Sequence, residues 1–195
     1  GDPQGRLVAM IDPQGRRVNL GYDGSGNLTS VTDANDGSRR LNILYTNSRI
    51  SEVNWGTRRV GYGYDGSNRL SQVTDVSNRI KLYTYHGTSQ LIHEVFNPLN
   101  QLVERVVYDD ENPPRVRQQT LQDGSQIAFQ YLAASSVMTT TGRDGRRDVD
   151  TIFYGANNAM TGVQRNGQTV LGSAFDGTFS PGTLRDGNNN TTSTT

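Results

Sequence analysis

The sequence contains no cysteine, which excludes disulfide bonds, thiolate zinc sites and cysteine nucleophiles. It has no net charge, since 19 basic residues balance 19 acidic ones, whereas nucleic-acid-binding proteins normally carry a basic excess or stripe. No apolar run approaches the length of a membrane-spanning helix, and no signal peptide is evident. These absences predict a chain that binds no nucleic acid and has no membrane span.

Hydrophobic residues are also scarce, at 32% of the chain, where soluble domains have about 45–50% apolar residues with glycine counted. Glycine is abundant, with 22 residues in 195. This composition favours turns and half-exposed strands over an ordinary packed globule. The aromatic residues are too regularly placed for a disordered chain.

An internal repeat is the strongest signal in the sequence. The segments Val18–Asp33, Val60–Asp75 and Asp2–Asp12 share the pattern apolar-x-apolar-x-Tyr-Asp-x-x-Gly/Asn-x-Leu-x-x-Val-x-Asp, and degenerate copies follow. One aromatic residue marks each copy at a spacing of 19 to 23 residues, and these anchors are Tyr22, Tyr45, Tyr64, Tyr85, Tyr108, Tyr131, Tyr154 and Phe175. The best-preserved copies add further predicted anchors, namely Asp23, Gly26 and Leu28, and Asp65 and Leu70.

Each copy is typical of a β-hairpin. Alternation places Leu20 and Tyr22 on one face of a strand. The turn residues that follow, Asp23–Gly26, tolerate positive φ or bond to their own backbone. Leu28 and Val31 are three residues apart in the return segment, which is too short for a helix, so a strand with a β-bulge is predicted.

A second turn closes each unit, at Asp12–Gly15, Asp33–Gly37, Asp123-Gly124 and Asp144-Gly145. One copy is expected to have a turn longer by about two residues, at Asp109–Pro114. The predicted fold is all-β: tandem antiparallel β-hairpin repeats form one long, curved or spiralling sheet. Residues 1–176 are expected to hold about eight hairpins, and the Gly/Asn/Thr-rich residues 177–195 a flexible tail.

These motifs resemble the YD-repeat, or Rhs (rearrangement hotspot), family. The resemblance rests on Tyr22-Asp23-x-x-Gly26-x-Leu28-x-x-Val31-x-Asp33, on the copy at Tyr64-Asp65 and on the Asp-Pro-Gln-Gly corners, and it covers about Asp2 to Gly167. In that family, hairpins join edge to edge into a sheet that spirals into a wide, hollow shell. Members include Rhs toxins, insecticidal toxin-complex components, bacterial wall-associated proteins and teneurins.

The resemblance implies a secreted or surface-displayed bacterial scaffold, with an enclosed cargo domain as a partner in the parent protein. Two departures limit it. Family shells use more repeats than the eight or nine present here, and the Asp-Pro-x-Gly-Leu segment that precedes the cargo in such toxins is absent. A toxin reading would therefore apply to a longer parent protein.

No constellation of residues predicts catalysis, a cofactor or a metal, so the chain is expected not to be an enzyme. His86 occupies the Asp position of its repeat and His93 follows on the next strand, without triad spacing. The acidic turns Asp33–Gly37 and Asp109–Glu111 lack the spacing of a calcium loop. Paired carboxylates for glycoside hydrolysis have no pocket-forming segment to house them.

Two groups of side chains admit a functional and a structural interpretation. The tyrosines could form a glycan-binding face, but recurrence once per repeat favours a structural ladder of stacked side chains. The arginine pairs at Arg16, Arg39, Arg58 and Arg146 are interpreted as solvated strand positions balanced by aspartates.

Three functions remain open. Because no capping unit is evident and sheet edges present unpaired backbone groups, the array is expected to continue into more of the same chain or into other copies. The first hypothesis is a structural segment of a secreted or surface Rhs-type shell or stalk. The second is an extracellular filament subunit joined through edge strands. The third is a carbohydrate- or receptor-binding adhesion module.

Overall fold

The computed structural model describes residues 4–155, 158–175, 181–188 and 190–193. The 18 described strands belong to one antiparallel sheet. Strands that follow one another in sequence pair as hairpin neighbours, as from β1 to β8 and from β9 to β18. The prediction of an all-β array of antiparallel hairpins is confirmed.

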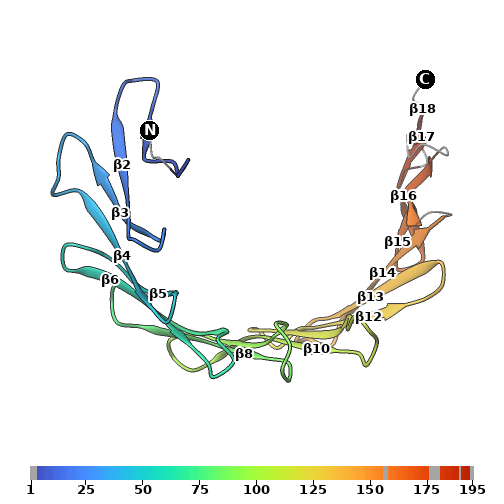
Figure 1. Cartoon of the computed structure of the whole chain (residues 1–195). Coiled ribbons are helices and arrows are strands. Elements are labelled where there is room, and N and C mark those ends of the chain that lie inside the picture. The colour runs from blue at the N-terminus through green and yellow to red at the C-terminus, as the bar shows by residue number, and fades with distance from the viewer. Residues whose placement is uncertain (1–3, 156–157, 176–180, 189, 194–195) are drawn as a thin grey trace. The chain divides into compact units, whose positions relative to one another are not determined.

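The chain forms two compact units, residues 1–84 with 96–100 and residues 85–95 with 101–195. The strands of the first unit follow one another from blue to green in Figure 1; they are β1 Ala9–Ile11, β2 Arg17–Tyr22, β3 Leu28–Asp33, β4 Arg40–Thr46, β5 Arg49–Trp55, β6 Arg58–Tyr64, β7 Leu70–Thr74 and β8 Ile80–Tyr85.

The second unit holds the remaining strands. They are β9 Ile92–Phe96, β10 Leu102–Tyr108, β11 Val116–Leu121, β12 Gln126–Tyr131, β13 Ser135–Thr141, β14 Arg147–Tyr154, β15 Met160–Arg165, β16 Gln168–Phe175, β17 Pro181–Asp186 and β18 Thr191–Ser193. Each pairs with the next along the chain.

The return strands carry the predicted bulge. Tyr22 lies opposite Leu28 and Gly21 opposite Ser30, so Thr29 is the extra residue of β3. The same shift occurs beside five other anchors, and the extra residues there are Ser51, Ser71, Arg117, Thr161 and Gly182. The bulge explains why residues three apart share a face, since Val31 lies opposite Leu20.

The pairing gives the first unit one apolar and one polar face. On the apolar face, Val31 lies opposite Leu20 on β2 and Leu41 on β4. We call this the tyrosine face because Tyr22, Tyr45 and Tyr64 continue it. On the polar face, Ser30 lies opposite Gly21 and Asn42. A Cβ atom at Gly21 would meet the Ser30 hydroxyl, so a side chain there requires this hydroxyl to rotate away.

Burial is shallow throughout the described residues. Among their apolar side chains only Val95 and Val106 are buried, and no large side chain is fully buried. No described helix or second sheet covers either face of the strands. Hydrophobic burial is therefore limited, and backbone pairing and polar contacts at the turns carry more of the stability than in a two-layer domain.

The expected tail contains regular structure in its described part. Strand β17 pairs with β16 and with β18, both antiparallel. The expected boundary at residue 176 lies outside the described residues.

Candidate functional site

The contacts between successive hairpins form the most regular constellation of side chains in the molecule. The Tyr45 hydroxyl donates a hydrogen bond of 3.0 Å to the carbonyl oxygen of Leu28. Leu28 is the residue opposite Tyr22 in the preceding hairpin. The side chain of one anchor thus bonds to the backbone beside the previous anchor.

The same bond recurs along both units. The Tyr64 hydroxyl donates to the carbonyl of Ile50, which lies opposite Tyr45, at 2.8 Å. Tyr131 donates to the carbonyl of Val116, which lies opposite Tyr108, at 2.9 Å. Two further bonds are of the same kind, Tyr22 to Leu7 at 2.8 Å and Tyr108 to Ile92 at 2.7 Å. We call these five bonds the tyrosine ladder.

Cationic side chains lie over the rings of this ladder. The guanidinium of Arg6 lies 4.7 Å from the ring centre of Tyr22, that of Arg49 5.7 Å from Tyr64, and that of Arg115 4.7 Å from Tyr131. Each arginine directly precedes the residue whose carbonyl accepts the bond from the same tyrosine. The ring and the hydroxyl of one tyrosine therefore contact two consecutive residues of the preceding hairpin. Each cation–π contact contributes about 0.5–1 kcal/mol at an exposed site.

At Tyr108 the neighbouring side chain is a histidine from another position of the hairpin. The His86 ring lies 5.3 Å from the Tyr108 ring at an angle of 50°. The sequence predicted stacked anchors, whereas the neighbours over these four rings are three arginines and a histidine. The signal for the arginines was available, because an arginine stands directly before Leu7, Ile50 and Val116.

Aspartate side chains stabilise the turns by accepting hydrogen bonds from the turn residues that follow them. Oδ1 of Asp65 accepts hydrogen bonds from the backbone N–H groups of Ser67 and Arg69, both at 2.9 Å, and Oδ2 accepts one from Nε of Arg69 at 2.8 Å. We call this arrangement the aspartate clasp. Asp75 repeats it with Ser77 and Arg79, so the same clasp serves both kinds of turn.

An asparagine can replace the arginine of the clasp. Nδ2 of Asn27 donates to Asp23, and Nδ2 of Asn190 donates to Asp186. The residue directly before the asparagine or arginine of the clasp has positive φ, as predicted from the turn composition. The angle φ is 85° at Gly26, before Asn27, and 64° at Asn68, before Arg69.

The insertion after Tyr108 preserves the clasp. Asp109 accepts from the backbone N–H of Arg115 at 2.8 Å and from its Nε at 2.9 Å, six residues along instead of four. The predicted lengthening by two residues is confirmed, and the ends of the longer turn keep the clasp contacts.

These hydrogen bonds shift the titration of the aspartates. The backbone N–H of Arg69 and then the guanidinium of the same residue hold the pKa of Asp65 below its usual value, against partial burial. At Asp23 the side-chain amide of Asn27 is the main cause of a lowered pKa. Burial, helped by the negative charge of Glu104, raises the pKa of Tyr108.

The remaining predicted anchors lie at corresponding places in their hairpins. Tyr85 ends β8, Tyr154 lies opposite Met160, and Phe175 lies opposite Pro181. Leu70 lies opposite Tyr64, as Leu28 does opposite Tyr22. The Tyr154 hydroxyl makes no ladder bond within the described part of the chain, where the preceding β12–β13 hairpin also lacks the bulge.

The side chains considered for chemistry have structural neighbours. Nδ1 of His93 lies 2.8 Å from the carbonyl oxygen of Val106 on the adjacent strand. In the described ranges, no three His, Asp or Glu side chains are grouped so as to hold a metal ion. No helix among the same residues is long and apolar enough to cross a bilayer.

Comparisons with known proteins agree with this geometry. Residues 1–38 match the family model described as RHS Repeat. No curated protein matches the sequence. The chain is similar in structure to the crystal structures of TcdB2-TccC3-Cdc42 (14% identity, TM-score 0.54) and TcdB2-TccC3 (13% identity, TM-score 0.52). Each match covers 97% of this chain, which spans only 13% of the other chain.

Proposed function

We propose that this chain, whose residues 1–38 match the RHS Repeat model, belongs to the YD-repeat, or Rhs, family and is a non-catalytic wall segment of a larger Rhs-type shell, secreted or displayed on the bacterial surface. Its partners are further repeats of the same parent chain, and the enclosed cargo is a domain of that parent. The predicted anchors Tyr22, Tyr45, Tyr64, Tyr108 and Tyr131 are the residues that join one repeat to the next.

The observation that carries this proposal is the tyrosine ladder. Each rung joins a side chain to a backbone atom 14 to 17 residues earlier, in the preceding hairpin. A contact that repeats with the hairpin period stabilises any number of repeats in the same way. The arrangement is therefore suited to building an extended wall.

The comparisons support a parent longer than this segment. The chain aligns over nearly its full length with 13% of chains in TcdB2-TccC3 structures. A non-catalytic role is supported by the contacts of the candidate chemical groups, since the aspartates bond within their turns and His93 lies against a backbone carbonyl. The glycan-binding alternative has less support, because the hydroxyls of the ladder are already engaged by backbone carbonyls.

The experiment is to isolate the native polypeptide and measure its intact mass, its cell fraction and its appearance in electron microscopy. A wall segment predicts a polypeptide several times longer than this chain, found outside the cytoplasm and forming hollow particles. A native polypeptide of this length alone, remaining monomeric in light scattering, would contradict the proposal. Growth of this chain into filaments would favour the edge-joined filament instead.

A further inference from the structure

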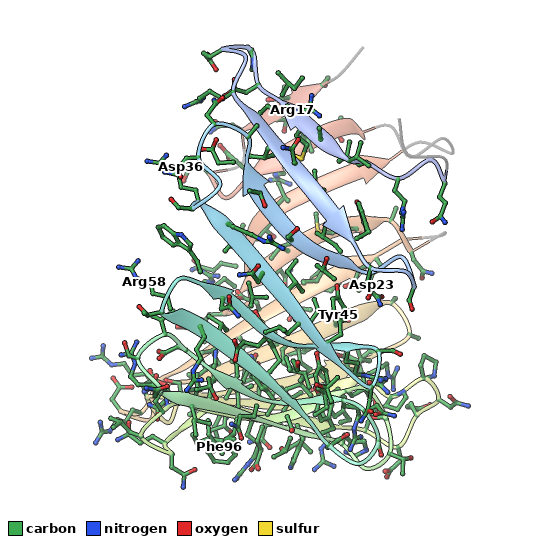
Figure 2. The ribbon with its side chains drawn as sticks, turned by 60° about the vertical axis from the view of Figure 1, so that its left-hand side comes forward. Arg17, Asp23, Asp36, Tyr45, Arg58 and Phe96 are labelled. Carbon is green, nitrogen blue, oxygen red and sulfur yellow. The ribbon has the colours of Figure 1, made fainter. Side chains whose placement is uncertain are left out.

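The turns of the sheet lie at the two ends of its strands. In Figure 2, Asp36 and Arg58 lie at one end of the first unit and Asp23 at the opposite end. The turn between β15 and β16 corresponds to the turns beside Asp36 and Arg58, because each of them joins an odd-numbered strand to the next strand. It differs in sequence, since it contains Asn166-Gly167, the only asparagine–glycine pair in the chain.

Both ends of the Asn166 side-chain amide bind to β14. Its Oδ1 accepts a hydrogen bond of 2.8 Å from the backbone N–H of Val149, and its Nδ2 donates one of 2.9 Å to Oδ1 of Asp148. The backbone N–H of Asn166 also donates to the carbonyl oxygen of Val149 at 2.7 Å. These three bonds extend the pairing of β14 with β15 by one residue beyond Arg165, and we call them the Asn166 contact.

An asparagine followed by glycine is chemically reactive, because glycine has no side chain to hinder its backbone nitrogen. When that nitrogen attacks Cγ of the asparagine, a bond between the two atoms forms and the bond between Cγ and Nδ2 breaks. The amide proton of the glycine leaves with Nδ2 as ammonia. Water then opens the resulting cyclic imide at either carbonyl, which gives aspartate or isoaspartate. Water is the only co-reactant, and Asn166 is exposed to it.

The Asn166 contact opposes this attack. The angle φ is 50° at Asn166 and 81° at Gly167, as in the tight two-residue turns of β-hairpins. For Cγ to reach the nitrogen of Gly167, the side chain must rotate, and this rotation breaks its bonds to Val149 and Asp148. We propose that Asn166 is a latent deamidation site, unreactive while its amide is bound to β14 and reactive when this contact opens.

The products of the reaction do not re-form the contact. In aspartate, an oxygen without a hydrogen replaces Nδ2, so a second carboxylate faces Asp148 and the two repel each other. The guanidinium of Arg165 is already engaged by Asp150, through bonds of 2.8 and 3.1 Å. In isoaspartate, an additional methylene in the backbone lengthens the turn. Deamidation therefore loosens the β15–β16 hairpin from β14 irreversibly.

The rate of deamidation tests the protection. The full chain and a synthetic peptide with the sequence of residues 163–171 are incubated at the same mildly alkaline pH, and mass spectrometry of proteolytic peptides measures the conversion of Asn166. We expect conversion to be at least about tenfold slower in the chain than in the peptide, and equally fast in denaturant. Asp148→Ala should speed conversion in the chain about threefold or more, because one bond of the amide is lost. Asp144→Ala is the matched control, since Asp144 pairs with Arg146 in the neighbouring turn, and it should have no effect.

Variants that mimic the product test the loosening. Asn166→Asp is expected to speed amide hydrogen exchange at Val149 and in β15 and β16 more than Asn166→Gly does, because glycine removes the side-chain bonds without adding a charge. Combining Asp148→Asn with Asn166→Asp should restore slow exchange, since the amide and the carboxylate then exchange places. Exchange in β2 to β5 should be unchanged in every variant, which checks that the rest of the sheet is folded.

Three results would overturn the proposal. The first is equal conversion of Asn166 in the folded chain and in the peptide, and the second is equal conversion in Asp148→Ala and Asp144→Ala. The third is hydrogen exchange in Asn166→Asp that is no faster than in Asn166→Gly. Every measurement uses this chain alone, so the result does not depend on whether a parent shell exists.

Discussion

At the scale of single residues, tyrosine suits the anchor position because its ring and its hydroxyl make different contacts. The ring lies on the half-exposed tyrosine face and, at Tyr22, Tyr64 and Tyr131, receives an arginine. The hydroxyl supplies the bond to the preceding hairpin. A phenylalanine retains the first role and loses the second.

Tyr45→Phe should therefore lower the free energy of unfolding by about 0.5–1.5 kcal/mol, because the bond to the Leu28 carbonyl is lost while the ring remains. Urea denaturation followed by circular dichroism measures the change. Tyr62→Phe is the control, since Tyr62 shares the face of Tyr64 but makes no hydroxyl hydrogen bond among the described residues. Equal losses in both variants would contradict the ladder.

The aspartate clasps predict a loss of stability in acid. The backbone N–H of Arg69 holds the pKa of Asp65 below its ordinary value, and that of Arg79 does the same at Asp75. A carboxyl whose pKa is lower in the folded state stabilises the fold fully above its unfolded pKa of about 3.9. That contribution disappears as the pH falls through the lower, folded value.

We expect the free energy of unfolding to be level near neutral pH and to decline below about pH 4. The double variant Asp65→Asn, Asp75→Asn should be less stable at neutral pH and should lose less of its stability on acidification. Denaturation at a series of pH values measures both slopes. Parallel pH profiles for the two proteins would show that these clasps are not the titrating groups.

The sequence predicts the turns better than it predicts the partners of the arginines. Asp, Gly and Asn act locally, within five residues, so their pattern indicates the turn directly. The position of Arg6 directly before Leu7 recurs in other hairpins, but its contact with Tyr22 also depends on the register between two hairpins, which this spacing alone does not give. Arg39 and Arg146 were interpreted as balanced by aspartates, and each does pair with one.

At the scale of elements, the hairpin and its bulge follow from spacing alone. Leu28 and Val31 stand three apart, and only an extra strand residue lets both face Tyr22 and Leu20. The insertion after Asp109 was equally visible, because it interrupts a pattern that is constant elsewhere. The hydroxyl bond between hairpins was not predictable, since any nearby carbonyl could accept it.

The insertion should be dispensable. Removing Pro113 and Pro114 places Arg115 four positions after Asp109, the spacing of the clasp at Asp65 and Arg69, and leaves Asn112 at the position where Asn68 has positive φ. We expect the unfolding free energy to change by less than about 0.5 kcal/mol. Thermal and urea denaturation measure it.

The matched control removes two residues from a turn that has none to spare. Deleting Ser67 and Asn68 brings Arg69 too close to Asp65 for the clasp to form. The free energy of unfolding of this variant should fall by at least about 1 kcal/mol. If both deletions cost the same, the clasp geometry is not what fixes turn length.

At the scale of the whole molecule, each strand contacts its neighbours in sequence and no second layer links distant repeats within the described residues. Stability in such an array is a sum of local terms. The repeat made this all-β architecture predictable. The composition of residues 177–195 suggested only flexibility, yet the clasp at Asp186 joins β17 to β18 there.

Locality should appear in hydrogen exchange. Tyr45→Phe is expected to speed amide exchange in β2 to β5 and to leave β10 to β13 unchanged, while Tyr131→Phe should do the reverse. Exchange followed by mass spectrometry of peptides resolves the two regions. A uniform rise across the chain in either variant would indicate a single cooperative unit in place of an additive array.

Every rung of the tyrosine ladder ends on a main-chain oxygen, an atom that no substitution removes. Leucine, isoleucine and valine all serve as its carriers, at Leu28, Ile50 and Val116. The acceptor of each hydroxyl bond therefore does not depend on which side chain stands at that position. Hairpins whose other side chains differ can be joined by the same bond.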